Sequence, residues 1–162
     1  MKVINRIVLL FAIVFFLTAG NTFGADKAVL KGIKAVDVYV GGKELNATQK
    51  SQLQTDVELK LRLAGIKVDL DASQWLVVDI SINEITGGDS KKVVLKYAHA
   101  EVYLSEWVLL LSRNQETSIL AKTWNRGFLM HGPPDDLWPY CRDRVRDLTD
   151  TFINDYLSVN QK

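Results

Sequence analysis

Apolar residues recur every three or four positions between residues 46 and 64, which is the spacing of one helical face. Asn46 can cap this helix, and Gln49 stands three residues later, where a capping box places Glu or Gln. Gly65 supplies the left-handed position at which many helices end. The expected stripe consists of Leu53, Val57, Leu61 and Ala64, widened by Leu59 and Leu63.

Strict alternation of apolar and polar residues begins directly after this glycine and predicts a strand over residues 66–70. Comparable patterns predict further strands over residues 33–40, 75–85, 93–111 and 118–130. A second helical stripe predicts a closing helix that begins near Leu137, with Pro139 tolerated in its first turn. The second stripe consists of Leu137, Cys141, Val145, Leu148, Phe152 and Tyr156.

The fourth predicted strand is too long to be regular over its whole length, so we expect a bulge or bend near Ser105 and Glu106. Ala98 and Ala100 are small enough to let a helix lie close to this strand. Residues 107–111 are apolar throughout, which predicts that this end is covered on both sides.

Together these elements predict an α+β fold with the order β-α-β-β-β-β-α. We expect a mixed, mostly antiparallel five-stranded sheet with two helices packed on one face. The opposite face of the sheet would then remain open to water or to a partner.

The amino-terminal segment has the pattern of a secretory signal peptide. Lys2 and Arg6 precede an apolar run over residues 7–17, and small residues follow up to Gly24. The run is shorter than the ~20 apolar residues that cross a bilayer, which disfavours the alternative of an uncleaved anchor. We therefore predict a cleaved signal over residues 1–24 and a single α/β domain over residues 25–162.

No catalytic, cofactor-binding or metal-binding residues are predicted. His99 and His131 lie on different predicted strands, and Asp79 on a mixed strand face is more often solvated than catalytic. The formal net charge of +1 argues against a nucleic-acid partner. Cys141 has no second cysteine to pair with, so it is either a buried thiol or a group for an intermolecular bridge or reaction.

Aromatic residues provide the one candidate site. Alternation places Tyr97, His99 and Tyr103 on a strand face that the helices should leave open, and tyrosine and tryptophan suit recognition surfaces. Ordinary solvent-side aromatics of a strand are the alternative. The candidate interaction surface consists of Trp75, Tyr97, His99, Tyr103 and Trp124.

The order of elements resembles that of small cell-envelope assembly modules. Examples are the amino-terminal domain of the Tol-system propeller protein and the curli-secretion and lipopolysaccharide-assembly lipoproteins. Residues 63–68 and 152–157 are similar to segments of uncharacterised exported bacterial proteins.

The sequence therefore favours a periplasmic or secreted non-catalytic module for binding or envelope assembly, acting through a sheet face or edge. Its expected partner is an unidentified envelope protein, with no nucleic acid and no stable membrane span after signal removal. A carrier of an apolar small molecule between sheet and helices is the alternative, and an enzyme is a weaker one.

Overall fold

The computed structural model describes residues 27–87, 92–112, 115–132 and 137–160. The predicted signal peptide lies outside these ranges. The elements follow the order η1 (Lys27–Leu30), β1 (Ala35–Val40), α2 (Ala47–Leu63), β2 (Lys67–Val68), β3 (Gln74–Gly87), β4 (Lys92–Ser112), β5 (Gln115–Gly132) and α3 (Leu137–Asn160). Apart from the short 3₁₀ helix η1, which the sequence pattern did not predict, this is the expected order.

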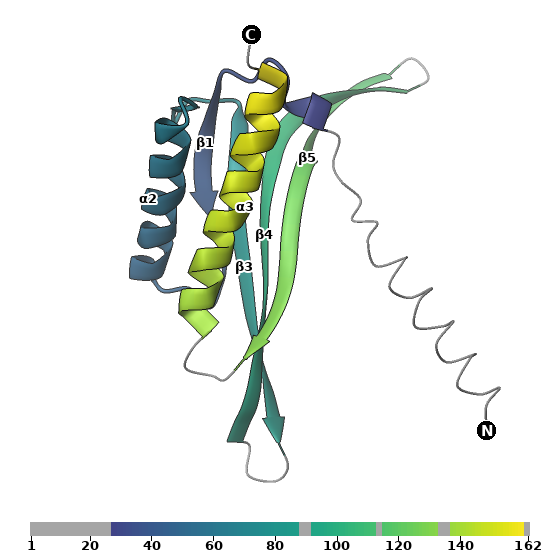
Figure 1. Cartoon of the computed structure of the whole chain (residues 1–162). Coiled ribbons are helices and arrows are strands. Elements are labelled where there is room, and N and C mark those ends of the chain that lie inside the picture. Colours follow the sequence, from purple (N-terminus) through teal and green to yellow (C-terminus); the bar gives the residue numbers. More distant parts are fainter. Residues whose placement is uncertain (1–26, 88–91, 113–114, 133–136, 161–162) are drawn as a thin grey trace, which may run out of the picture.

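The five strands form one sheet in the order β2-β1-β3-β4-β5. β1 pairs in parallel with β2 and with β3 over short stretches, whereas the β3–β4 and β4–β5 ladders are antiparallel and long. Both helices lie against the same face of the sheet (Figure 1). The predicted α+β class, strand number and one-sided helix layer are therefore confirmed.

Local signals set both ends of α2. The Asn46 side chain accepts a hydrogen bond from the Gln49 amide at 2.9 Å, and the Gln49 side chain accepts one from the Asn46 amide at 3.0 Å. This is the predicted capping box. At the other end Gly65 has a φ of +80°, and the Ile66 amide donates to the Leu61 carbonyl at 2.9 Å. This 6→1 bond closes a Schellman motif and turns the chain into β2.

Large apolar side chains fill the layer between helices and sheet. Trp124 of β5 meets Phe152 of α3 edge to face, with 5.1 Å between the ring centroids, and both are fully buried. Ala98 and Ala100 are also fully buried beneath the helix layer, which agrees with their expected role of admitting a helix closely. The layer is completed by Val36, Val38, Leu53, Val57, Leu61, Leu76, Val78, Ile80 and Val145.

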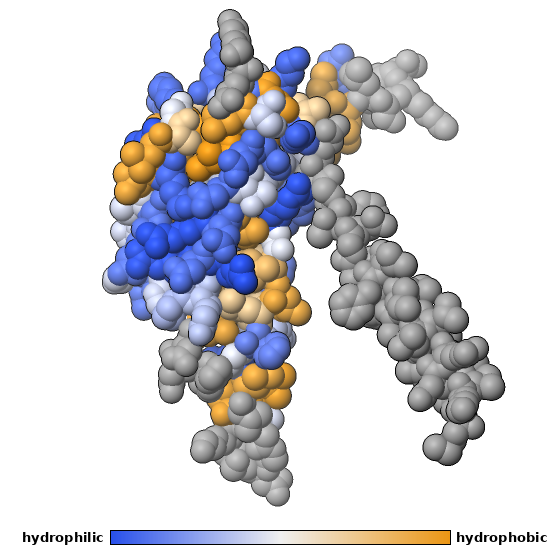
Figure 2. Space-filling view, in the orientation of Figure 1, coloured by the Kyte–Doolittle hydropathy of each residue, from blue (hydrophilic) through white to orange (hydrophobic). Residues whose placement is uncertain are grey.

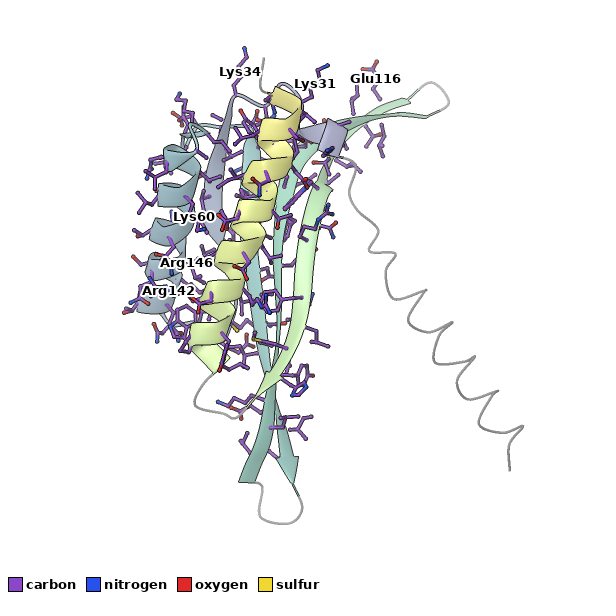
Figure 3. The ribbon with its side chains drawn as sticks, viewed as in Figure 1. Lys31, Lys34, Lys60, Glu116, Arg142 and Arg146 are labelled. Atoms are coloured by element: carbon purple, nitrogen blue, oxygen red, sulfur yellow. The ribbon has the colours of Figure 1, made fainter. Side chains whose placement is uncertain are left out.

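Polar side chains join the two helices along their outer seam. Asp56 of α2 accepts hydrogen bonds from the Arg142 guanidinium of α3 at 2.7 and 3.1 Å, and Arg146 lies 3.5 Å from the same carboxylate. Lys60 of α2 donates to Asp150 of α3. Figure 3 shows Lys60, Arg142 and Arg146 along this seam, within the hydrophilic surface that Figure 2 shows over the helices.

Two packing expectations are wrong. Leu59 and Leu63 do not widen the buried stripe of α2, because both are exposed on its outer side. The apolar end of β4 is not covered, since Trp107, Leu109 and Leu110 are all exposed. The ladders explain the second result: the last β3–β4 pair is Gln74 with Glu106, so β4 and β5 run on alone beyond it.

The irregularity expected near Ser105 is present, but it lies in the ladder with β5. The register shifts between Leu104 and Ser105, which pair with Trp124 and Lys122 respectively. One extra residue, Thr123, therefore sits on the β5 side, as in a β-bulge. The bend separates the part of the hairpin that covers the core from the part that projects beyond it (Figure 1).

Candidate binding surface

The sheet face opposite the helices is left open by every element that the structure describes, and we call it the open face. Alternation along each strand gives it rows of side chains that run across the sheet. One row contains Tyr39, Val77, Tyr103 and Asn125, and the next contains Asp79, Glu101 and Gly127. Two further rows consist of Ser81, His99 and Leu129, and of Asn83, Tyr97 and His131.

Four of the five candidate surface residues lie on the open face. Tyr97 and His99 are exposed, whereas Tyr103 and Trp75 are half-buried. Trp75 pairs with Ser105 near the bulge, one row from the Tyr103 row. The structure thus brings these four residues onto one surface, as their strand parity predicted, but it does not test whether that surface binds anything.

Trp124 does not belong to this surface, and its inclusion was wrong. It points to the helix side, where it is fully buried and donates its indole N–H to Asp155 at 3.0 Å. Arg126, two residues along the same strand face, lies 5.5 Å from the indole ring and 3.4 Å from the same carboxylate. Both sets of alternating residues around Trp124 mix apolar and polar side chains, so the sequence pattern did not reveal which set faced the core.

Lys122 lies next to the bulge, and its side chain contacts two residues in the middle of the open face. Its Nζ lies 3.9 Å from the centroid of the Tyr103 ring and 2.6 Å from Glu101, which also accepts a hydrogen bond from Asn125 at 3.1 Å. Partial burial raises the pKa of Glu101, but the bonds from Lys122 and Asn125 outweigh it and leave that pKa below its ordinary value. Burial raises the pKa of Tyr103. The Tyr103 side chain is therefore neutral, and the Lys122 ammonium group covers part of its ring.

Sequence reasoning missed the two most exposed apolar groups of the open face. Tyr39 of β1 is 60% exposed and Leu129 of β5 is 71% exposed. Residues 33–40 look apolar on both parities, so the outward direction of Tyr39 was not evident. Leu129 pairs with His99 in the β4–β5 ladder and therefore faces outward, but the sequence does not give that register.

The open face also carries both histidines that the sequence analysis considered. His99 and His131 lie in adjacent rows, and no hydrogen bond or ion pair joins either to a carboxylate among the described residues. The same residues contain no cluster of three or more His, Cys, Asp or Glu side chains able to hold a metal ion. Within them, no helix combines the length and hydrophobicity needed to cross a bilayer.

A shallow hollow of about 360 Å³ lies elsewhere, beside the start of β1. Residues 32–35 and 71–74 line it, together with Asp69. The Asp69 carboxylate is already engaged by Lys67, and that bond holds the pKa of Asp69 below its ordinary value. Lys34, Asp69 and Asp71 are among the residues that line the hollow, so it does not resemble a predominantly apolar ligand site.

Comparisons with known proteins identify no family for the chain. No family model matches it, and no curated protein matches it. Among solved structures, the PelC dodecamer from Paraburkholderia phytofirmans is 12% identical, covering 80% of this chain and 88% of that one with a TM-score of 0.40. The rare lipoprotein B from Shewanella oneidensis is 17% identical, covering 75% and 94% with a TM-score of 0.33. A minor lipoprotein from Acinetobacter baumannii is 13% identical, covering 75% and 91% with a TM-score of 0.36.

These likenesses are too low to assign a common fold or a function. The sequence resembled envelope lipoproteins, and two of these structural matches are lipoproteins. No family model supports the resemblance.

Proposed function

We propose that this protein is a non-catalytic binding module of the bacterial cell envelope, which recognises a protein partner through the open face of its sheet. The observation that carries the proposal is the exposure of Tyr39, Tyr97 and Leu129 on a sheet face that no described helix covers. Tyrosine offers a large apolar ring with a polar end, which suits the centre of a protein interface.

Polar groups around these residues fit the same role. Asp79 and Glu101 occupy the row between that of Tyr39 and those of Leu129 and Tyr97, so polar and apolar groups alternate across the face. A protein interface as a whole is about as polar as the rest of a protein surface, so this mixture suits recognition of a protein. The face also lies on strands, so little conformational entropy is lost when a partner binds.

Export to the periplasm is part of the proposal and rests on the amino-terminal sequence alone. Lys2 and Arg6, the apolar run over residues 7–17 and the small residues before Ala25 fit a cleaved signal. Release of the mature chain is measurable as a mass decrease between precursor and periplasmic protein. A chain that keeps residues 1–24 in the cell would contradict this part of the proposal.

Carriage of an apolar molecule between sheet and helices gains no support from the described core. Trp124, Phe152 and Leu61 occupy that layer with no exposed surface, and the aromatic rings are in direct contact. A carrier requires an apolar cavity that encloses most of its ligand. Protein recognition on the outer surface requires no such space.

Site-specific crosslinking in the intact envelope tests the proposal. A photoreactive phenylalanine analogue replaces Tyr39 in one variant and Tyr97 in another. Tyr140 of α3 is the matched control, because it is 61% exposed against 60% for Tyr39 but belongs to the helix layer. We expect one envelope protein to be captured from Tyr39 and Tyr97 and not from Tyr140. Capture from Tyr140 alone, or equally from all three positions, would count against recognition by the open face.

A further inference from the structure

The open face holds two pairs of a tyrosine and a carboxylate, and among the described residues only the first pair holds a cation. In that pair, Tyr103 and Glu101 stand two residues apart on β4 and share Lys122. The Nζ atom of Lys122 lies 3.9 Å from the centroid of the Tyr103 ring and 2.6 Å from the Glu101 carboxylate. An ammonium group placed in this way makes a cation–π contact and a charge-assisted hydrogen bond together.

Tyr39 and Asp79 form the second pair, on the neighbouring strands β1 and β3. Gly41 shows that their side chains lie close together: a Cβ on this glycine would be 3.0 Å from Oδ1 of Asp79 and 3.6 Å from Cε1 of Tyr39. Burial is the main cause of the raised pKa of Tyr103; Lys122 lowers that pKa, and the charge of Asp79 raises it. The Asp79 carboxylate therefore lies beside one tyrosine and within electrostatic range of the other.

The second pair has no cation among the residues that the structure describes. Asp79 is exposed, and no lysine, arginine or histidine of the described ranges lies within ion-pair distance of its carboxylate. His99, one row away, turns toward β5, since its Nε2 would lie 3.5 Å from a Cβ on Gly127. Tyr39 and Asp79 are thus open to a cation from outside the chain.

The position of Asp79 in the ladder also favours an external cation. Asp79 pairs with Glu101 between β3 and β4, and like charges directly opposite each other destabilise a sheet. Lys122 and Asn125 offset the charge of Glu101 alone. A cation bound at Asp79 would relieve the remaining repulsion.

An apolar floor lies between the two tyrosines. Val77 stands between Tyr39 and Tyr103 in their row, and it is only 8% exposed although no described helix covers it. Water is therefore largely excluded from the floor beside both rings. Cation–π contacts are stronger where the cation is desolvated.

The net charge of the surrounding rows complements a basic group. In the rows from that of Trp75 to that of Asn83, the charged side chains are three carboxylates and one ammonium group, those of Asp37, Asp79, Glu101 and Lys122. With the histidines neutral, this part of the open face is negative. Such a surface attracts a basic partner and disfavours an acidic one.

We propose that Tyr39 and Asp79 bind a lysine or arginine side chain of the protein partner, as Tyr103 and Glu101 bind Lys122. The inference rests on the function proposed above and names the chemistry of its partner, which presents a basic residue at the centre of its contact surface. Arginine fits the pair best, because its planar guanidinium stacks on an aromatic ring and donates two parallel hydrogen bonds to a carboxylate.

The affinity of the partner captured from Tyr97 tests this inference. The variant is Asp79→Asn, which keeps the shape of the side chain and removes its charge. The matched control is Asp143→Asn, which removes the same charge from α3, where the Asp143 side chain is 72% exposed. In about 50 mM salt we expect Asp79→Asn to bind at least about 10-fold more weakly than wild type, and Asp143→Asn to bind as wild type does. Salt of about 1 M should weaken wild type more than Asp79→Asn.

Crosslink mapping gives a second measurement on the same complex. A photoreactive analogue at Tyr39 should attach next to a lysine or arginine of the partner. Replacing that basic residue with glutamine should weaken binding to wild type and leave binding to Asp79→Asn nearly unchanged, which is the signature of two residues in contact.

The outcomes separate this inference from the proposed function. Capture from Tyr97 with equal affinities of wild type and Asp79→Asn would overturn the inference and leave recognition by the open face intact. Equal weakening in Asp79→Asn and Asp143→Asn would also overturn it, because the effect would then be one of net charge. Failure of Tyr97 to capture any protein would refute the proposed function, and the inference with it.

Discussion

The ion pair between Asp56 and Arg142 gives a quantitative test of how the two helices are held together. Asp56→Asn removes the carboxylate charge without a change in shape, and Arg142→Gln replaces the guanidinium with a shorter neutral amide. Asp56 keeps 14% of its side chain exposed and Arg142 keeps 35%, so the pair is largely out of water. Fully exposed pairs contribute about 0.2–1 kcal/mol, and breaking a buried pair costs about 3–5 kcal/mol.

We therefore expect each single substitution to lower the free energy of unfolding by about 1–2 kcal/mol, with a coupling energy of about 1 kcal/mol between the two sites. For a domain of this size, 1 kcal/mol corresponds to roughly 3–5 °C in the thermal midpoint. Urea unfolding of wild type, both single variants and the double variant measures the coupling directly.

The same pair predicts a dependence on pH. The hydrogen bond from Arg142 holds the pKa of Asp56 below its ordinary value of 3.8, although burial opposes the shift. A carboxyl whose pKa is lowered by folding contributes stability that is fully present above its unfolded pKa. That contribution is lost as the pH falls through the lower folded pKa. The difference between wild type and Asp56→Asn should therefore shrink below about pH 4.

Arg144 and Asp147 provide the control pair. They lie 3.2 Å apart within α3, but their side chains are 61% and 63% exposed. The same double-mutant cycle should give a coupling below about 0.3 kcal/mol. Equal coupling in the two cycles, or an Asp56 effect that persists undiminished in acid, would refute the reasoning about the seam.

Two further predictions concern the interior and the turns. Burial raises the pKa of the Cys141 thiol to about 11, so we expect no reaction with Ellman's reagent near neutral pH until the protein unfolds; rapid reaction of the folded protein would contradict its burial. A Cβ on Gly42, which has a φ of +125°, would lie 2.5 Å from the Ile80 carbonyl oxygen, whereas Gly65 at a φ of +80° meets no atom within 4 Å. Gly42→Ala should therefore cost about 2–4 kcal/mol in urea unfolding and Gly65→Ala only about 1 kcal/mol, and equal costs would show that the steric argument fails.

Local patterns predicted most of the fold, because each element carries its own signal. The Asn46–Gln49 capping box, the Gly65 stop and the stripe through Phe152 depend on neighbours in the sequence, and the structure contains all three. Strand order had no such signal. The placement of β1 between β2 and β3 depends on pairing between distant segments, which alternation alone does not specify.

The candidate surface was only partly predictable for the same reason. Tyr97, His99 and Tyr103 were placed on the open face because one strand parity was clearly more polar. Trp124 was misplaced because the bulge at Thr123 changes the register, and a bulge leaves no certain mark in one sequence. The exposure of the apolar end of β4 was not predicted, because an apolar run looks the same whether or not another element covers it.

The most direct test of recognition by the open face is the dissociation constant for the partner captured from Tyr39. It should be measured for wild type, for Tyr39→Ala with Leu129→Ala, and for Tyr140→Ala. Truncating an interface hot spot costs about 2 kcal/mol or more, so we expect the double variant to bind at least about 30-fold more weakly at an unchanged unfolding midpoint. Tyr140→Ala should bind as wild type does. An unchanged dissociation constant in the double variant would contradict the account.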